Sequence, residues 1–199
     1  MATNALAYKH FEKAFDYYFR GNRRAFKEVR KAIKHDPAWS RSHWLLGTLF
    51  MLMPPRDVES AIREFREVTR LEPRWSHGHY HLGKALMAQG RIDEALVPLR
   101  EALRLAPDAA WARVELAECL LKRNDYREAI TVLRGKPSLS PYYTLADAYL
   151  LIAEAWVGGG RTDLARPAWE FVLTLDDTIP AYRLAKEEAR RRLLETAKP

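Results

Sequence analysis

Apolar positions recur along this chain at the three- and four-residue spacing of amphipathic helices, and a longer period runs through them. Prolines that would end helices lie 36, 34 and 34 residues apart. They are Pro37, Pro73, Pro107 and Pro141. Twelve residues before each lies an alanine, and one more continues the series: Ala25, Ala61, Ala95, Ala129 and Ala165. No segment alternates as a strand does, so the chain is predicted to be an all-α repeat protein.

Small residues upstream of these alanines predict that the helices pair as hairpins. They are Ala14, Gly47, Gly83, Ala117 and Ala153, most of them preceded by Leu46, Leu82, Leu116 or Ile152. Small side chains let two antiparallel helices approach closely, and a proline cannot continue a helix. Residues that tolerate positive φ fall between the paired helices: Gly21, Gly90, Asn124 and the glycines 158–160.

At these residues the chain resembles the tetratricopeptide repeat family, and the stretch YHLGKALMAQGRIDEALVPLREALRLAP is the best match. The resemblance covers roughly residues 7 to 179. It implies one domain over residues 1–199, built as a right-handed superhelical solenoid of about five hairpins. The predicted hairpins span 7–37, 40–73, 74–107, 108–141 and 143–178, and a capping helix follows at 180–197.

Several irregularities interrupt the repeat. Lys13 replaces an aliphatic residue, two extra residues fall in the loop 53–56, Pro137 interrupts a helix, and an extension follows Pro141. We favour tolerated loop variation over a shaped partner surface, because surface loops accept insertions at little thermodynamic cost. In the last helix, capping through a stripe of four apolar residues is favoured over a basic contact by Arg190–Arg192. The stripe is Tyr182, Ala185, Ala189 and Leu193.

The composition describes a chain with a hydrophobic core, since 48% of residues are apolar and 30% are charged. Its one cysteine, Cys119, excludes an internal disulfide framework and suits a reducing compartment. No signal-peptide pattern opens the sequence, and the longest apolar stretch is too short for a membrane span. We therefore expect a cytoplasmic protein.

The family resemblance implies that the first helix of each hairpin lines a concave groove. The predicted groove residues are Tyr8, Phe11, Tyr18, Arg41, Trp44, Met51, His77, Tyr80, Lys84, Met87, Trp111, Val114, Glu118 and Leu121. An aromatic and methionine-rich surface suits an apolar peptide or an amphipathic helix. Each residue is equally well explained as core packing. Other columns already supply the core, however, so Trp44, Tyr80 and Trp111 are predicted as binding anchors.

The predicted groove does not match the carboxylate clamp that some tetratricopeptide proteins build from Lys, Asn and Arg, although its charged residues are unevenly distributed. The corresponding face here carries Trp44 and Tyr80, and it has no asparagine. Basic residues, such as Arg41, lie toward the start of the groove, whereas acidic residues lie toward its end. The acidic residues are Glu118, Asp147 and Glu154.

The net charge of +7 raises nucleic acid as an alternative partner. Arginines recurring on the second helices predict a basic ridge on the convex side: Arg30, Arg66, Arg100 and Arg134. A solvated face with local pairing to Glu64, Glu67 and Glu101 is the favoured interpretation. Basic residues are interleaved with glutamates along every helix, apart from the run Arg190–Arg192, so binding of RNA or another anion stays the less favoured alternative.

Catalysis and metal binding are not expected. His77 and His81 lie one helical turn apart and could share a metal, but no acidic residue follows His77 as in zinc proteases. His79 and His43 occupy equivalent places, where packing is expected. No nucleophile–base pair, phosphate loop or cofactor motif is present in the sequence. The sequence predicts a protein–protein scaffold or adaptor, with self-association into an assembly as a further alternative.

Overall fold

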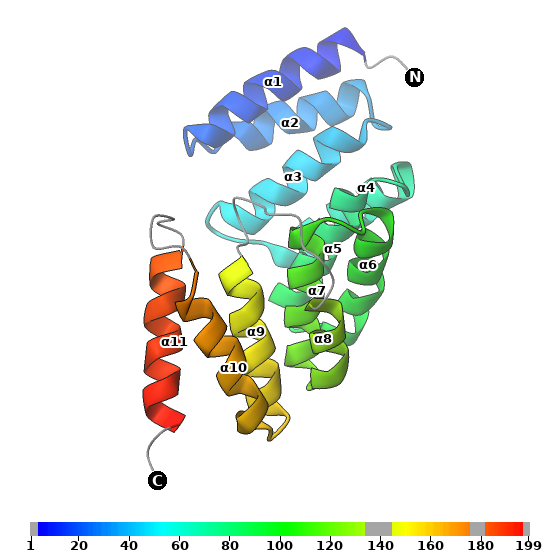
Figure 1. Cartoon of the computed structure of the whole chain (residues 1–199). Helices are drawn as coiled ribbons and strands as arrows, with labels where there is room; N and C mark the ends of the chain where they lie inside the picture. The colour runs from blue at the N-terminus through cyan, green and yellow to red at the C-terminus, as the bar shows by residue number, and fades with distance from the viewer. Residues whose placement is uncertain (1–3, 134–144, 176–181, 197–199) are drawn as a thin grey trace. The chain divides into compact units, whose positions relative to one another are not determined.

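The computed structural model describes residues 4–133, 145–175 and 182–196, and within these ranges every regular element is an α-helix (Figure 1). The prediction of an all-α protein is therefore confirmed. The chain divides into two compact units, Met1–Leu105 and Ala106–Pro199. We describe each unit by itself.

The first unit holds three antiparallel hairpins. Helix α1 packs on α2, α3 on α4, and α5 on α6, while α2 contacts α3 and α4 contacts α5. The bounds of these helices are α1 (Ala5–Phe19), α2 (Arg24–His35), α3 (Ser40–Leu52), α4 (Val58–Leu71), α5 (Ser76–Ala88) and α6 (Ile92–Leu105).

The second unit continues the same pattern of neighbours and adds one helix. Helix α7 packs on α8, α8 on α9, and α9 on α10, while α11 contacts both α10 and α9. The bounds are α7 (Ala110–Lys122), α8 (Tyr126–Leu133), α9 (Leu145–Gly158), α10 (Thr162–Leu173) and α11 (Tyr182–Thr196). The continuous solenoid over both units, its hand and its repeat number remain predictions.

The small residues of the repeat lie where paired helices meet. Each alanine of the proline-linked series has no exposed surface: Ala25, Ala61, Ala95, Ala129 and Ala165. A Cβ added at Gly47 would lie 2.7 Å from the Phe65 ring, and one at Gly83 would lie 2.5 Å from Cδ2 of Leu99. Since neither approach leaves room for a side chain, the sequence-based explanation of these glycines is confirmed.

The hairpin turns share one hydrogen-bond pattern. The residue with positive φ is Gly21, Gly90, Asn124 or Gly160, with φ of 62°, 77°, 66° and 74°. The N–H of the next residue donates to the carbonyl five positions back, which caps the preceding helix. These bonds are Asn22 to Tyr17, Arg91 to Leu86, Asp125 to Leu120 and Arg161 to Trp156.

The second hairpin keeps that bond in spite of its longer loop. The N–H of Asp57 donates to the carbonyl of Phe50 at 3.0 Å, seven positions back instead of five. The Asp57 side chain then accepts from the N–H of Ser60 at 2.9 Å and caps α4. The two extra residues are therefore accommodated without loss of the turn's closing bond.

Helix α11 covers the end of the second unit through the predicted stripe. Tyr182, Ala185 and Ala189 are buried and pack with Trp169 of α10, and Leu193 is half-buried against the same cluster. A terminal repeat needs such a cover because its apolar face has no further neighbour. The predicted capping helix is confirmed.

Some predicted features lie outside the described residues. These are Arg134, Pro137 and Pro141. Among the described residues, no helix combines the length and apolar character needed to cross a membrane.

Candidate partner-binding surface

Aromatic side chains of α1 meet the start of α3 in the first unit. The ring of Trp39 lies 4.7 Å from Phe11 and 6.1 Å from Tyr8, measured between ring centroids. Tyr8 is 50% exposed, so it offers surface while its ring is supported from one side. Phe15, Tyr18 and Phe19 continue the contacts along α1, with Phe15 and Phe19 edge to face at 4.8 Å.

A second group of rings joins α3 to α5. Trp44 lies edge to face with Trp75 at 6.3 Å and with His81 at 5.7 Å. The guanidinium of Arg41 stacks over Trp75 at 3.8 Å, a cation–π contact. Arg41 therefore does not project as an isolated groove cation, because its charge lies on an aromatic face.

His81 is a neutral packing residue at physiological pH. Burial, together with the nearby charges of His77 and Lys84, lowers the pKa of His81 to about 3. Its ring stacks on Phe65 at 5.3 Å and meets Tyr80 at 5.1 Å. The ring of His81 is thus held between Phe65 and Tyr80 in the packed first unit.

Trp44 is supported by the neighbouring hairpin instead of standing apart. The sequence assigned it no packing partner within its own hairpin, yet it packs against the core of the first unit as well as on Trp75 and His81. Its indole Nε1 is buried and has no hydrogen-bond acceptor among the described residues. Contacts between successive hairpins thus explain some of the aromatic residues that the core columns do not need.

Sequence reasoning missed Trp39 and Trp75. Each lies two residues after a helix-ending proline and is the N-cap residue of the next helix, with extended dihedral angles and no side-chain capping bond. Ala109 holds the same place before α7. This column recurs with the repeat period, so comparison of the residues after Pro37, Pro73 and Pro107 would have found it.

We use the name aromatic surface for nine exposed or half-buried rings that are carried by α1, α3 and α5 or by the residue just before α3 or α5. Its members are Tyr8, Phe11, Tyr18, Phe19, Trp39, Trp44, Trp75, His77 and Tyr80. Met51 and Met87 are half-buried on the same helices, α3 and α5. Lys84 lies 3.3 Å from the Tyr80 hydroxyl, and its Nζ is 5.3 Å from the Tyr80 ring centroid.

The predicted groove residues of the second unit differ in exposure. Trp111 is half-buried, whereas Val114 is only 3% exposed and has little surface to offer a partner. Glu118 and Leu121 line a hollow of about 440 Å³ with Leu151 and Glu154 of α9. A single groove across both units remains a prediction.

The hairpins and repeat columns coincide with matches to family models. Two models described as tetratricopeptide repeat match the chain, one at residues 56–110 and one at 86–137. These residues include α4 to α8 and the turn at Gly90, which lies in the stretch that best matches the family. The chain is a tetratricopeptide repeat protein.

Solved structures of tetratricopeptide repeat proteins share this fold. A MamA structure from Desulfovibrio magneticus RS-1 is 18% identical with a TM-score of 0.77, over 90% of this chain and 99% of that one. YrrB, a TPR protein with an unusual peptide-binding site, is 17% identical with a TM-score of 0.72, over 96% and 100%. The first TPR of Spaghetti (RPAP3) bound to the HSP90 peptide SRMEEVD is 18% identical with a TM-score of 0.56, over 60% and 97%. At such identities the likeness is one of fold. A search of curated protein sequences finds no match.

The predicted basic ridge of the tetratricopeptide hairpins is accompanied by acidic neighbours. Arg66 lies 3.5 Å from Glu94, and the guanidinium of Arg30 lies 5.9 Å from the Phe26 ring centroid. One turn further along these helices, two arginines form close ion pairs at 2.6 Å: Arg70 with Glu67, and Arg104 with Glu101. Arginines that pair with nearby glutamates agree with the favoured interpretation of these helix faces as solvated surface.

A recurring contact ties the second, third and fourth tetratricopeptide hairpins to the proline that precedes each of them. Nε2 of His43 lies 3.0 Å from the Pro37 carbonyl, and Nε2 of His79 lies 2.9 Å from that of Pro73. In the fourth hairpin Arg113 donates to the equivalent carbonyl, of Pro107, at 2.6 Å. These histidines therefore have structural partners, and no group of three or more potential metal ligands occurs among the described residues.

His43 should make the stability of the protein depend on pH. Its Nδ1 lies 2.7 Å from Oε2 of Glu64, so both ring nitrogens face acceptors and the protonated ring satisfies both. Burial opposes the charge, but the bonds to Glu64 and Pro37 and the charges of Glu64 and Glu67 prevail, and the pKa of His43 is raised. The stabilisation is complete below pH 6.5, the pKa of an ordinary histidine, and is lost as the pH rises through the folded-state pKa.

Urea denaturation at a series of pH values tests this dependence. We expect the free energy of unfolding of the wild type to fall as the pH rises from 6.5 through the folded-state pKa of His43. His43→Gln should remove the fall, whereas His35→Gln, at an exposed histidine, should keep it. An unchanged pH profile in His43→Gln would contradict the assignment.

Proposed function

We propose that this protein is an interaction scaffold that holds an apolar or amphipathic segment of another protein on its aromatic surface. The observation that carries the proposal is the run of mutually supported rings on α1, α3 and α5, several of which keep exposed faces. Tyr8 is 50% exposed and Phe19, at the end of α1, is 72% exposed. Exposed aromatic residues grouped in this way are typical of protein interaction sites.

Support from neighbouring rings favours binding by these residues. Trp44, Trp75 and His81 hold one another edge to face, and Arg41 covers one face of Trp75. A ring already fixed by such contacts loses little conformational entropy when a partner packs on it. Aromatic side chains also bury a large apolar area each, so a few of them can supply most of the binding energy.

The remaining groove residues favour an apolar partner over an acidic chain end. Arg41 and Lys84 both lie against aromatic rings, and Lys84 also contacts the Tyr80 hydroxyl. The flexible thioethers of Met51 and Met87 can adapt to side chains of different shape. Among proteins of this fold, YrrB is described as having an unusual peptide-binding site, and the RPAP3 structure holds an HSP90 peptide. These precedents support a peptide-binding scaffold, a role that needs no catalytic group.

Quantitative affinity purification from the native cell tests the proposal. We expect Trp44→Ala/Tyr80→Ala to lower recovery of the main partner at least about tenfold, since truncating one interface anchor costs about 2 kcal/mol or more. The matched control is Val97→Ser/Leu184→Ser, which removes two residues that are 72% and 76% exposed outside the aromatic surface. It should leave recovery unchanged.

Folding must be measured in the same variants, because Trp44 also packs on the core. Trp44→Phe/Tyr80→Ser keeps an aromatic ring at position 44 and serves as a milder variant. A folded Trp44→Ala/Tyr80→Ala variant that recovers the partner as well as the wild type does would overturn the proposal.

A further inference from the structure

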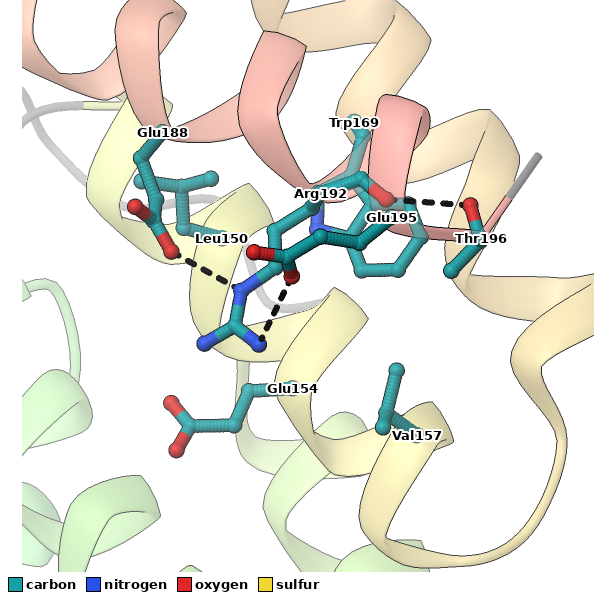
Figure 2. Close-up of a pocket in the computed structure, with 8 residues that line it drawn as sticks. All are labelled: Leu150, Glu154, Val157, Trp169, Glu188, Arg192, Glu195 and Thr196. Carbon is teal, nitrogen blue, oxygen red and sulfur yellow. Dashed lines mark hydrogen bonds and ion pairs between the residues drawn. The ribbon is translucent and has the colours of Figure 1, made fainter. Parts of the chain in front are cut away.

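A cavity of about 250 Å³ opens in the second unit, where α9, α10 and α11 meet (Figure 2). Its apolar lining is Leu150 and Val157 of α9 and Trp169 of α10. Its polar lining comes mostly from α11, with Glu188, Arg192 and Glu195, and Glu154 of α9 joins them. One small hollow thus combines an apolar wall with three carboxylates and one guanidinium.

The sequence of α11 explains why the apolar wall stays uncovered. The side chains by which α11 packs on its neighbours include Ala185 and Ala189, which are short. The last turns of α11 then present Glu188, Arg192 and Glu195 to the cavity. None of these three covers Val157, which is 40% exposed.

Internal pairing leaves a negative charge at this cavity. Nε of Arg192 donates to Glu188 at 2.8 Å, and its Nη1 lies 3.7 Å from Glu195. Hydrogen bonds from Arg191 and Arg192 lower the pKa of Glu188, so it stays ionised. Glu154 forms no hydrogen bond or ion pair with any described residue, and Figure 2 shows its side chain reaching toward the side of the cavity where Arg192 lies.

We propose that this cavity receives a lysine or arginine side chain from a segment of a partner protein. The aliphatic stem would pack on the exposed Val157 and the half-buried Leu150, with the buried Trp169 ring beneath them, and the cationic end would reach Glu154 at the rim. Basic side chains are suited to such a site because they bury their stems and keep the charged end in a polar environment. An acidic side chain would meet three carboxylates, and a purely apolar one would desolvate Glu154 without a bond in return.

This cavity is separate from the aromatic surface, since every residue that lines it belongs to the second unit. Charge complementarity selects the occupant: Arg191 and Arg192 pair with Glu188 and Glu195, and the carboxylate of Glu154 is left as the excess negative charge of the lining. Arg192 already shows that a guanidinium fits beside Glu188 and Glu195.

Three end-capped ten-residue peptides test the proposal. They share one sequence of alanine, glutamine and leucine and differ only in a central lysine, glutamine or glutamate. We titrate each into the ¹⁵N-labelled full chain and follow the indole N–H signal of Trp169 by NMR. The lysine peptide should bind about fivefold more tightly than the glutamine peptide, the effect of one partly exposed ion pair, and the glutamate peptide more weakly still.

Glu154→Gln should abolish the preference for lysine over glutamine. The matched control is Glu170→Gln on α10, whose exposed carboxylate pairs with Arg166 at 2.9 Å outside the cavity. It should keep the preference. Trp44→Phe/Tyr80→Ser should also bind the lysine peptide as the wild type does, so failure here is distinct from failure of the aromatic surface.

Four outcomes would overturn the inference. Equal binding of the lysine and glutamine peptides would mean an apolar cavity without charge selection. Preferential binding of the glutamate peptide would assign recognition to Arg192. No shift of the Trp169 signal with any peptide would mean that the cavity takes no side chain. Equally tight binding of n-hexylammonium would point to a small amine instead of a partner protein.

Discussion

Gly83→Val should lower the free energy of unfolding by about 2–3 kcal/mol. Gly83 lies on α5 where α6 approaches it, and an added Cβ would lie 2.5 Å from both Cγ and Cδ2 of Leu99. Leu99 is fully buried, so it has no free space into which to move. The clash should outweigh the gain in helix propensity of about 0.5 kcal/mol from removing a glycine inside a helix.

Urea denaturation of a double-mutant cycle checks the cause. Leu99→Ala alone should destabilise by about 2–5 kcal/mol through the cavity that it leaves. The double variant should be more stable than the sum of the two losses predicts, by about 1–2 kcal/mol, because the valine fills part of that cavity. Ala88→Val, on the exposed side of the same helix, controls for β-branching and should cost less than about 0.7 kcal/mol. Strict additivity in the cycle would show that Gly83 and Leu99 do not compete for one space.

Phe65→Ala should destabilise the protein by about 3–5 kcal/mol. Phe65 is 1% exposed, and its ring fills the space over Gly47 and stacks on His81. The loss combines the transfer of the ring out of the core with the cavity left between α3 and α4. Val97→Ala, at a residue that is 72% exposed on α6, is the control and should change stability by less than about 0.5 kcal/mol.

Phe65→Ala should also raise the pKa of His81, which burial holds at about 3. Water entering the space of the lost ring would stabilise the imidazolium form. The pKa is measured by NMR titration of the His81 ring in the folded variant. A pKa that stays near its wild-type value would mean that Trp44 and Tyr80 alone exclude water from His81.

The sequence predicted those parts of the fold that depend on contacts within one hairpin. Gly47 and Gly83 could be explained from their columns, because each faces the residue four positions after the alanine of its own hairpin, Phe65 or Leu99. The positive φ at Asn124 was predictable for the same reason, since a turn of constant length needs one such residue. Local constraints of this kind repeat with the chain and are therefore visible in it.

The candidate site was predicted less completely, because its contacts join different hairpins. The sequence selected Trp44 and Arg41 from helix faces, but their contacts with Trp75 depend on how one hairpin stacks on the next. The cavity beside Glu154 depends on the placement of α11, which no repeat column specifies.

The sequence by itself determined the helical hairpins, their turns and the residues that must be small, because periodic positions face the same neighbour in every repeat. Only the tertiary structure decided which aromatic rings support one another and which keep exposed faces. It alone also showed that Glu154 lies beside an apolar wall without an ion pair to any residue that the structure describes. The physical reason is that a contact between hairpins depends on side-chain size and rotamer in two repeats at once, whereas the period of one chain records only the contacts that every repeat shares.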